Sequence, residues 1–195
     1  GRVTGFESHA GTTPMPLRRD ALSAMSELAL AIEKVALAHA PNAVATIGEL
    51  NIVNPSRNVI PGEIAFTLDV RSPDAAVMDA LDRDIRAALG EIATRRRVEI
   101  KLDQIWRKPP TIFDSKLVDA VQAAATELGY SYRRITSGAG HDACNVASVI
   151  PAAMIFVPCK DGISHNELED ATQADCSAGA NVLLHAVLAV AGVAK

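Results

Sequence analysis

The first 106 residues alternate between two hydrophobic patterns, one with a period of two residues and one with helical spacing. Four segments rich in Val, Ile, Thr or Phe are predicted to be β-strands; they are residues 2–8, 44–53, 63–70 and 98–106. Apolar positions with helical spacing run from Arg18 to about His39 and from Asp74 to about Arg95, and they predict two helices.

The order of these elements is strand, helix, strand, strand, helix, strand. This is the order of the ferredoxin-like fold, in which a four-stranded sheet carries two helices on one face. We therefore predict a ferredoxin-like α+β domain over residues 1–107, followed by a linker at Lys108–Pro110.

Residues 108–195 show a different pattern, in which helical and strand-like runs alternate. The expected helices cover about residues 115–128, a short stretch from His141 and residues 173–193, and the expected strands cover residues 132–136 and 153–157. This alternation is typical of an α/β fold, but two strands are too few for a sheet with helices on both faces. We predict an incomplete portion of an α/β domain.

Composition excludes several function classes. The chain has 19 basic and 23 acidic residues, a net charge of −4 and only 4% aromatic residues, which argues against a nucleic-acid partner. No run reaches the roughly 18 uninterrupted apolar residues of a membrane span, and no signal-peptide pattern opens the chain. We expect a cytoplasmic protein with no membrane partner, whose three cysteines are reduced thiols.

Three polar residues stand in turns or at strand ends, where functional groups are often placed. His9 lies in a polar turn after the first predicted strand, Asn58 lies in the loop before the third, and Arg71 directly follows the third. An amide and a planar guanidinium suit the binding of a carbonyl and a carboxylate. Each residue is also open to a plain structural role in a surface turn or at a solvated strand end.

His165 follows the last predicted strand, at the position where α/β proteins place ligand-binding loops. Imidazole is a common metal ligand, and Glu167 or Glu169 is near enough along the chain to orient its second nitrogen. One histidine does not make a metal site, because zinc or manganese needs three or more protein ligands. From the residues alone, His165 is either a ligand or an unspecialised loop histidine.

A glycine-rich turn, Gly138–Ala143, matches the pattern G-x-G-x-x-A between a predicted strand and a helix. One interpretation is a dinucleotide site, which the polar preceding strand and Pro151 after the turn both disfavour. We favour a cradle of backbone N–H groups for an oxyanion or a carboxylate.

Five motifs occur in a fixed order along the chain. They are His9–Met15 with Arg19–Ala21, Asn58–Gly62, Asp69–Arg71, Ser137–Ala143 and Ser164–Glu167. Taken together, they resemble the M20-type metal-dependent amidohydrolases, in particular the group of N-carbamoyl-L-amino acid hydrolases, allantoate amidohydrolases and β-ureidopropionases. The resemblance covers the whole chain, and the ordered combination is far more specific than any one motif.

The resemblance implies roles for five residues. His165 corresponds to a ligand of one of two active-site metal ions, and His9 to a lid-domain histidine that reaches the partner subunit's active site and stabilises the developing oxyanion. Asn58 and Arg71 correspond to substrate-binding residues, the arginine for the substrate carboxylate. Gly140 corresponds to a backbone contact with the substrate.

The resemblance also implies an architecture and a reaction. Residues 1–107 would be the lid and dimerisation domain of a homodimer, and residues 108–195 the C-terminal portion of the catalytic domain. Two divalent ions, zinc or manganese with cobalt and nickel as alternatives, would activate the water that hydrolyses the carbamoyl or ureido amide bond of a small substrate.

Members of this group carry a long N-terminal half with an H-x-D motif, a bridging aspartate, a Glu-Glu pair and a further metal-binding histidine. None of these precedes Gly1, so we expect a fragment that lacks the general base and most metal ligands and is inactive alone. Two alternatives stay open. One is an aminoacylase or dipeptidase of the same superfamily, and the other is a non-catalytic module for dimerisation and substrate recognition.

Overall fold

A computed structural model describes residues 1–192 of the chain. Contacts divide it into two compact units, unit 1 from Gly1 to Pro110 and unit 2 from Thr111 onward. The division falls at the end of the Lys108–Pro110 segment, three residues after the predicted boundary at residue 107. Each unit is described by itself.

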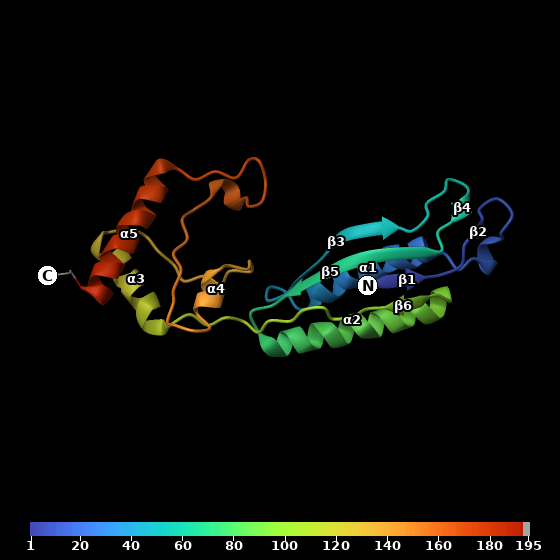
Figure 1. Ribbon diagram of the computed structural model, residues 1–195, viewed down its shortest axis with the longest axis horizontal. Helices are drawn as coiled ribbons and strands as arrows, with labels where there is room; N and C mark the ends of the chain where they lie inside the picture. Colours follow the sequence, from blue (N-terminus) through green and yellow to red (C-terminus); the bar gives the residue numbers. More distant parts are fainter. Residues whose placement is uncertain (193–195) are drawn as a thin grey trace. The chain divides into compact units, whose positions relative to one another are not determined.

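Unit 1 is built on a four-stranded antiparallel sheet in the order β3-β5-β1-β6. Its strands are β1 (Arg2–Thr4), β3 (Val44–Ile52), β5 (Glu63–Arg71) and β6 (Glu99–Lys101). Helices α1 (Ala21–Ala38) and α2 (Ala75–Arg96) run along the sheet and pack on it and on each other (Figure 1). This order of elements and of strands is the predicted ferredoxin-like arrangement.

The core of unit 1 lies between the sheet and the two helices. Alternation of apolar and polar residues along β5 determines which of its side chains enter the core. Ile64 and Phe66 are buried, whereas Thr67 and Asp69 are exposed. Buried side chains from each helix face these strands; the largest are Met25, Leu28, Leu81 and Ile85. The opposite face of the sheet carries exposed polar side chains such as Thr67 and Asp69, together with exposed Val44.

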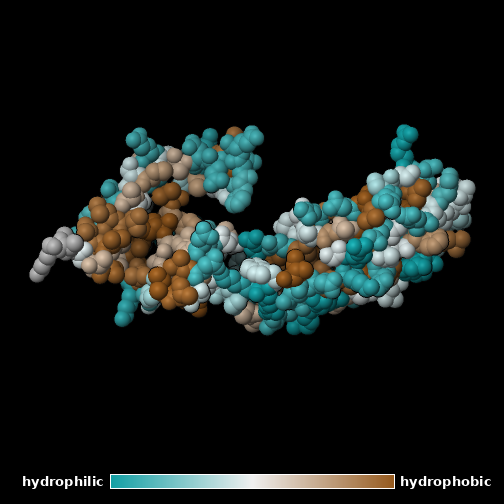
Figure 2. Space-filling model, viewed as in Figure 1, coloured by the Kyte–Doolittle hydropathy of each residue, from teal (hydrophilic) through white to brown (hydrophobic). Residues whose placement is uncertain are grey.

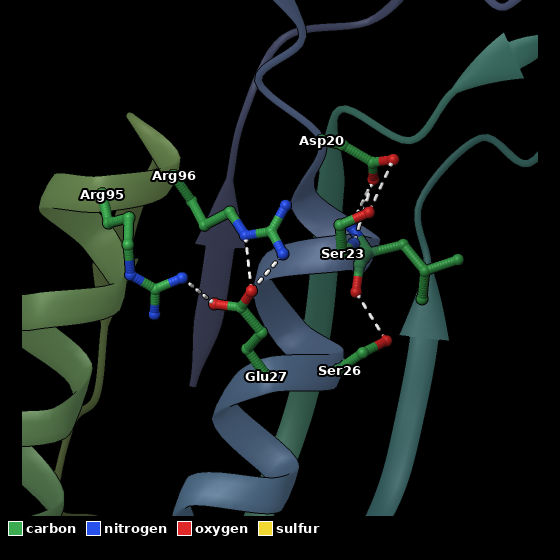
Figure 3. Close-up of polar contacts among 7 residues, drawn as sticks. Asp20, Ser23, Ser26, Glu27, Arg95 and Arg96 are labelled. Carbon is green, nitrogen blue, oxygen red and sulfur yellow. Dashed lines mark hydrogen bonds and ion pairs between the residues drawn. The ribbon is translucent and has the colours of Figure 1, made fainter. Parts of the chain in front are cut away.

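Acidic N-caps decide where the helices begin. The Asp20 carboxylate accepts hydrogen bonds from the backbone N–H groups of Leu22 and Ser23, so α1 begins at Ala21, three residues after the predicted start. Asp74 caps α2 in the same way. The end of α2 is tied to α1, because Glu27 forms ion pairs with Arg95 and Arg96 (Figure 3).

Two predicted strands of unit 1 are shorter than expected. The first divides into β1 and β2 (Ser8–His9), and β2 leaves the main sheet to pair with β4 (Val59–Ile60). The last stops at Lys101, and the side chains of Ile105 and Trp106 are 93% and 74% exposed. Their apolar character predicted a strand, but no neighbouring strand is there to pair with them.

Over residues 111–192, unit 2 contains two packed helices and two short helical turns. They are α3 (Ser115–Glu127), α4 (Ala143–Val146), the 3-10 turn η2 (Lys160–Gly162) and α5 (Gln173–Ala191). Buried Ala124 and Ala125 of α3 pack against Val182 and Ala186 of α5. Both long helices confirm the prediction, except that the predicted end of α5 at Val193 lies outside the described residues.

The strands predicted at residues 132–136 and 153–157 are wrong for this chain, because the described part of unit 2 contains no strand. A strand exists only where another strand accepts and donates its backbone hydrogen bonds. The hydrophobic run Ala153–Val157 has the composition of a strand buried in a parallel sheet, and no such neighbour lies beside it within residues 111–192.

Helix α5 leaves much of its apolar surface exposed (Figure 2). Leu183, Leu184 and Val190 are each more than half exposed, and the helix is apolar on most of its circumference. Between α3, α5 and the Ala153–Val157 segment lies a hollow of about 640 Å³, which we call the α3–α5 groove. Its lining includes Leu117, Val121, Ile155, Val157, Leu183 and Val187.

By length and composition, α5 is also the one helix of residues 1–192 that is apolar enough to cross a membrane. Its mean hydropathy is 1.4, and only 11% of its span is buried. Core helices of soluble proteins pass the same test, so this property is weak evidence for a membrane partner.

Candidate functional site

The pairing of β2 with β4 brings His9 and Asn58 together. His9 is the register partner of Val59, and the backbone N–H of Ala10 donates a 2.8 Å hydrogen bond to the carbonyl oxygen of Asn58. Both side chains are exposed, and the Asn58 Oδ1 atom accepts a 3.0 Å hydrogen bond from the Ser56 hydroxyl. Two polar residues 49 positions apart in sequence thus share one end of unit 1.

Arg71 lies elsewhere in unit 1, as the last residue of β5. Its Nε and Nη2 atoms donate hydrogen bonds of 2.8 Å to the two carboxylate oxygens of Asp69, two residues earlier on the exposed face of the sheet. Hydrogen bonding by Arg71 lowers the pKa of the Asp69 carboxyl, and the same bond raises the pKa of the guanidinium. The predicted carboxylate-binding fork is therefore already ion-paired, and it does not meet His9 or Asn58 within one copy of the chain.

The glycine turn of unit 2 is organised by a serine and a histidine. The Ser137 hydroxyl lies 2.8 Å from His141 Nε2 and accepts a 3.1 Å hydrogen bond from the backbone N–H of Ala139. Gly140 is exposed in this turn. The serine–histidine contact was not predicted, although the two residues stand four apart inside the Ser137–Ala143 motif.

The dinucleotide interpretation of this turn is wrong. No strand precedes Gly138 in the described part of unit 2, and α4 after it has only four residues. A pyrophosphate site needs a strand, the glycine turn and the N-terminus of a full helix in succession.

His165 lies in the exposed loop between η2 and α5, with a positive φ of 58°. Its Nδ1 atom is 2.7 Å from the Ser164 hydroxyl, which leaves Nε2 directed away from this contact. Glu169 accepts a 2.8 Å hydrogen bond from the backbone N–H of His165. The expectation that Glu167 or Glu169 orients the imidazole is therefore wrong, because Ser164 contacts the ring and Glu169 fixes the backbone.

A complete metal centre does not fit the residues of this chain alone. No group of three or more His, Cys, Asp or Glu side chains converges on one point within residues 1–192. His165 is a single exposed imidazole, and zinc or manganese requires further protein ligands.

Comparison with known proteins shows to which family the chain belongs. The model of Peptidase family M20/M25/M40 matches residues 6–189. The chain belongs to this family.

Individual relatives are similar over nearly all of the chain. The N-carbamoyl-L-amino-acid amidohydrolase of Rhizobium meliloti is 43% identical over 193 residues, which are 99% of this chain and 46% of that protein. The allantoate amidohydrolase of Escherichia coli strain K12 is 34% identical over 182 residues, 93% of this chain and 44% of that protein. The chain thus spans about half the length of the curated relatives it matches.

Solved structures give the same result. A hydantoinase/carbamoylase family amidase from Burkholderia ambifaria superimposes with a TM-score of 0.90 at 48% identity, covering 100% of this chain and 46% of that one. The mixed α/β architecture described above is therefore that of M20-family amidases.

Proposed function

We propose that this chain is part of a hydrolase that cleaves the carbamoyl or ureido C–N bond of N-carbamoyl-L-amino acids or allantoate. The observation that carries the proposal is the β2–β4 pairing, which holds an exposed imidazole and an exposed amide side by side. The names of the relatives support this substrate class, since they include N-carbamoyl-L-amino-acid amidohydrolases, an allantoate amidohydrolase and a ureidoglycolate hydrolase.

In this proposal the chain supplies groups that bind the substrate and stabilise charge. His9 donates a hydrogen bond from Nε2 to the carbonyl oxygen as it becomes an oxyanion, and the Asn58 amide donates a second. Arg71 binds the substrate carboxylate with its planar guanidinium, beside or in place of Asp69. The glycine turn at Gly140 contributes a backbone contact. Removal of one oxyanion donor typically lowers kcat by about 100-fold or more.

The proposal includes a homodimer formed through unit 1. Strand β5 separates Asn58 from Arg71, and its nine residues span about 26 Å at a rise of roughly 3.3 Å per residue. A small ureido acid cannot bridge that length. His9 and Asn58 of one copy therefore act with Arg71 of its partner.

We also propose that His165 is one ligand of a divalent ion, zinc or manganese with cobalt and nickel as alternatives. The remaining ligands would come from parts of the whole protein that correspond to the uncovered half of its relatives. A bound divalent ion supplies an activated water for hydrolysis. Such a whole protein would act in the cytoplasm.

A second candidate function is a dimerisation and substrate-recognition module without catalysis. The observation that favours it is that unit 1 has its own closed core, whereas residues 1–192 bring no set of metal-ligating side chains together.

A chimera tests these two functions. This chain would replace the matching part of the Rhizobium meliloti amidohydrolase, and hydrolysis of N-carbamoyl-L-amino acids and of allantoate would be measured with added manganese or zinc. We expect metal-dependent turnover by the chimera and none by the chain alone. A soluble, folded chimera without turnover, which still binds an N-carbamoyl amino acid through Arg71, would favour the recognition module and refute the proposed reaction.

The same chimera tests the individual roles. We expect His9→Ala to lower kcat by about 100-fold and His165→Ala to abolish stoichiometric metal binding. Metal binding and full turnover in His165→Ala would refute the proposed ligand.

A further inference from the structure

The turn that begins at His9 is closed by backbone hydrogen bonds. The backbone N–H groups of Thr12 and Thr13 donate to the His9 carbonyl oxygen at 3.3 and 3.1 Å. The segment then continues through Pro14 into the 3-10 turn Met15–Leu17. His9 is therefore the first residue of a closed turn, and the orientation of its ring depends on the shape of that turn.

Gly11 contacts the His9 ring directly. Its backbone N–H donates a 3.0 Å hydrogen bond to His9 Nδ1. A nitrogen that accepts a hydrogen bond carries no proton, so the neutral imidazole holds its proton on Nε2. A Cβ atom on Gly11 would lie 3.1 Å from His9 Cε1 and 3.4 Å from Nδ1, so a side chain there would shift the ring by a few tenths of an ångström.

Arg18 bridges the turn from the other side. Its Nε atom donates a 3.0 Å hydrogen bond to the Thr13 carbonyl oxygen, and its Nη2 atom donates a 2.6 Å hydrogen bond to the Ala10 carbonyl oxygen. The side chain is half-buried. One planar guanidinium thus ties together the two peptide groups that flank Gly11 and Thr12, which an ammonium group with its point charge cannot reproduce.

The Arg18 segment is in turn anchored to the end of α2. Arg97, the left-handed C-cap of that helix, donates through Nη2 to the carbonyl oxygens of Pro16 and Arg18 at 2.5 and 3.3 Å. Arg19 Nε donates back to the Arg97 carbonyl oxygen at 2.7 Å. These contacts connect the His9 turn to a helix that ends about 80 residues later in sequence.

We infer that Arg18 and Gly11 are positioning residues for His9, which hold its imidazole in the Nε2–H form with that proton directed away from the turn. The functional meaning of this inference rests on the proposed role of His9 as an oxyanion donor. The structural claim concerns only unit 1, so it is testable in the chain without any catalytic partner.

Nitrogen NMR of the His9 ring tests the structural claim in this 195-residue chain. With the imidazole neutral, the unaltered chain should show Nδ1 as an unprotonated and Nε2 as a protonated nitrogen. In Arg18→Ala and in Gly11→Ala, both signals should move toward the averaged position of an exchanging imidazole. Arg86→Ala is the matched control, because Arg86 also donates to a backbone carbonyl, that of Leu102, outside the His9 turn.

Arg18→Lys separates the guanidinium geometry from the charge. It keeps the positive charge but lacks the planar fork that holds two N–H donors at a fixed spacing, so its ring signals should resemble those of Arg18→Ala. Unchanged His9 signals in folded Arg18→Ala and Gly11→Ala would overturn the inference, and full recovery in Arg18→Lys would overturn the bridging role of the guanidinium. Circular dichroism is used to check that each variant is folded.

Activity in the chimera tests the functional meaning. Arg18→Ala and Gly11→Ala should lower kcat by about 10- to 100-fold with little change in KM, since a donor misplaced by about 1 Å weakens only the transition state. An inactive chimera with the expected ring signals in the chain would refute the proposed function and leave the positioning intact. An active chimera whose kcat is unaffected by either variant would refute the positioning role and leave the function intact.

Discussion

Asn58 precedes strand β5 and Arg71 ends it, so the two proposed substrate-binding residues lie at opposite ends of the same strand. The carbonyl oxygen of Asn58 is bonded to the His9 turn, whereas Arg71 is bonded to Asp69. A site that uses all three side chains on one small molecule therefore requires two copies of the chain. This requirement gives the first prediction.

Mixing two impaired variants of the chimera should restore activity, measured at a substrate concentration well below KM, where both variants turn over slowly. With His9→Ala and Arg71→Ala combined in equal amounts, half of the dimers are mixed, and one site of each mixed dimer has both residues intact. We expect about a quarter of the unmutated activity, as random pairing of subunits predicts. Each variant mixed with itself is the control, and an equal mixture with no more activity than either parent would show that the site is formed within one copy.

Arg71 should affect substrate binding more than the chemical step. Loss of a charge-assisted hydrogen bond costs about 1.5–3 kcal/mol, so Arg71→Ala in the chimera should raise KM by roughly 10- to 100-fold. The change in kcat should be smaller, because the substrate carboxylate carries the same charge throughout the reaction. Arg83→Ala, which removes another exposed, carboxylate-paired arginine of unit 1, is the control. A KM in Arg71→Ala that changes no more than in Arg83→Ala would contradict the assignment.

Glu27 should make the stability of unit 1 depend on pH in the acid range. Hydrogen bonding by Arg96 lowers the pKa of the Glu27 carboxyl below its usual value of 4.5. The carboxylate therefore contributes stability above that pH, and the contribution is lost as the pH falls below 4.5 through the lowered value. Glu27→Gln should cost about 1 kcal/mol at neutral pH and flatten the acid limb of the stability curve.

Chemical denaturation at a series of pH values measures this effect. Glu33→Gln, on the exposed face of the same helix, is the matched control and should change neither the stability nor its pH dependence appreciably. If the free energy of unfolding of Glu27→Gln falls with decreasing pH as steeply as that of the unaltered chain, the ion pairs with α2 do not stabilise the fold.

The α3–α5 groove should matter only in the whole protein. Leu183 is 56% exposed in the chain, so Leu183→Ser should change the stability of the chain by less than about 0.5 kcal/mol. In the chimera we expect the apolar side chain to be covered, and the same variant should then cost about 2 kcal/mol or more. Val182→Ala, at a position already buried against α3, should destabilise both proteins. Equal small effects of Leu183→Ser in both would show that the groove stays exposed.

The sequence predicted the helices and the main strands of unit 1 because local signals define them. Apolar positions with helical spacing predicted α1 and α2, and alternation along residues 63–71 assigns one face of β5 to the core. The predicted start of α1 was three residues too early because the Asp20 cap was not recognised. The strands predicted for unit 2 were wrong because a strand forms only when a neighbouring strand completes its backbone hydrogen bonds. Ala153–Val157 has the composition of a strand without a partner in the described residues.

The motifs predicted the residues of the candidate site but not how they are arranged. The motifs identified His9, Asn58 and Arg71, yet only the β2–β4 pairing shows which two of them meet. Arg18 was missed because its role depends on two backbone carbonyl groups, which leave no trace in residue type. The one available signal is its position between the His9 turn and the cap of α1.

The exposed apolar surface of α5 gives the two units different requirements for completing their folding. Unit 1 buries its core through contacts within Gly1–Pro110, so its folding is unimolecular and insensitive to dilution. Unit 2 leaves α5 uncovered within residues 111–192, so its burial is completed only by contacts from outside that range. Until those contacts form, its exposed leucines and valines present the kind of surface that chaperones bind and that leads to aggregation.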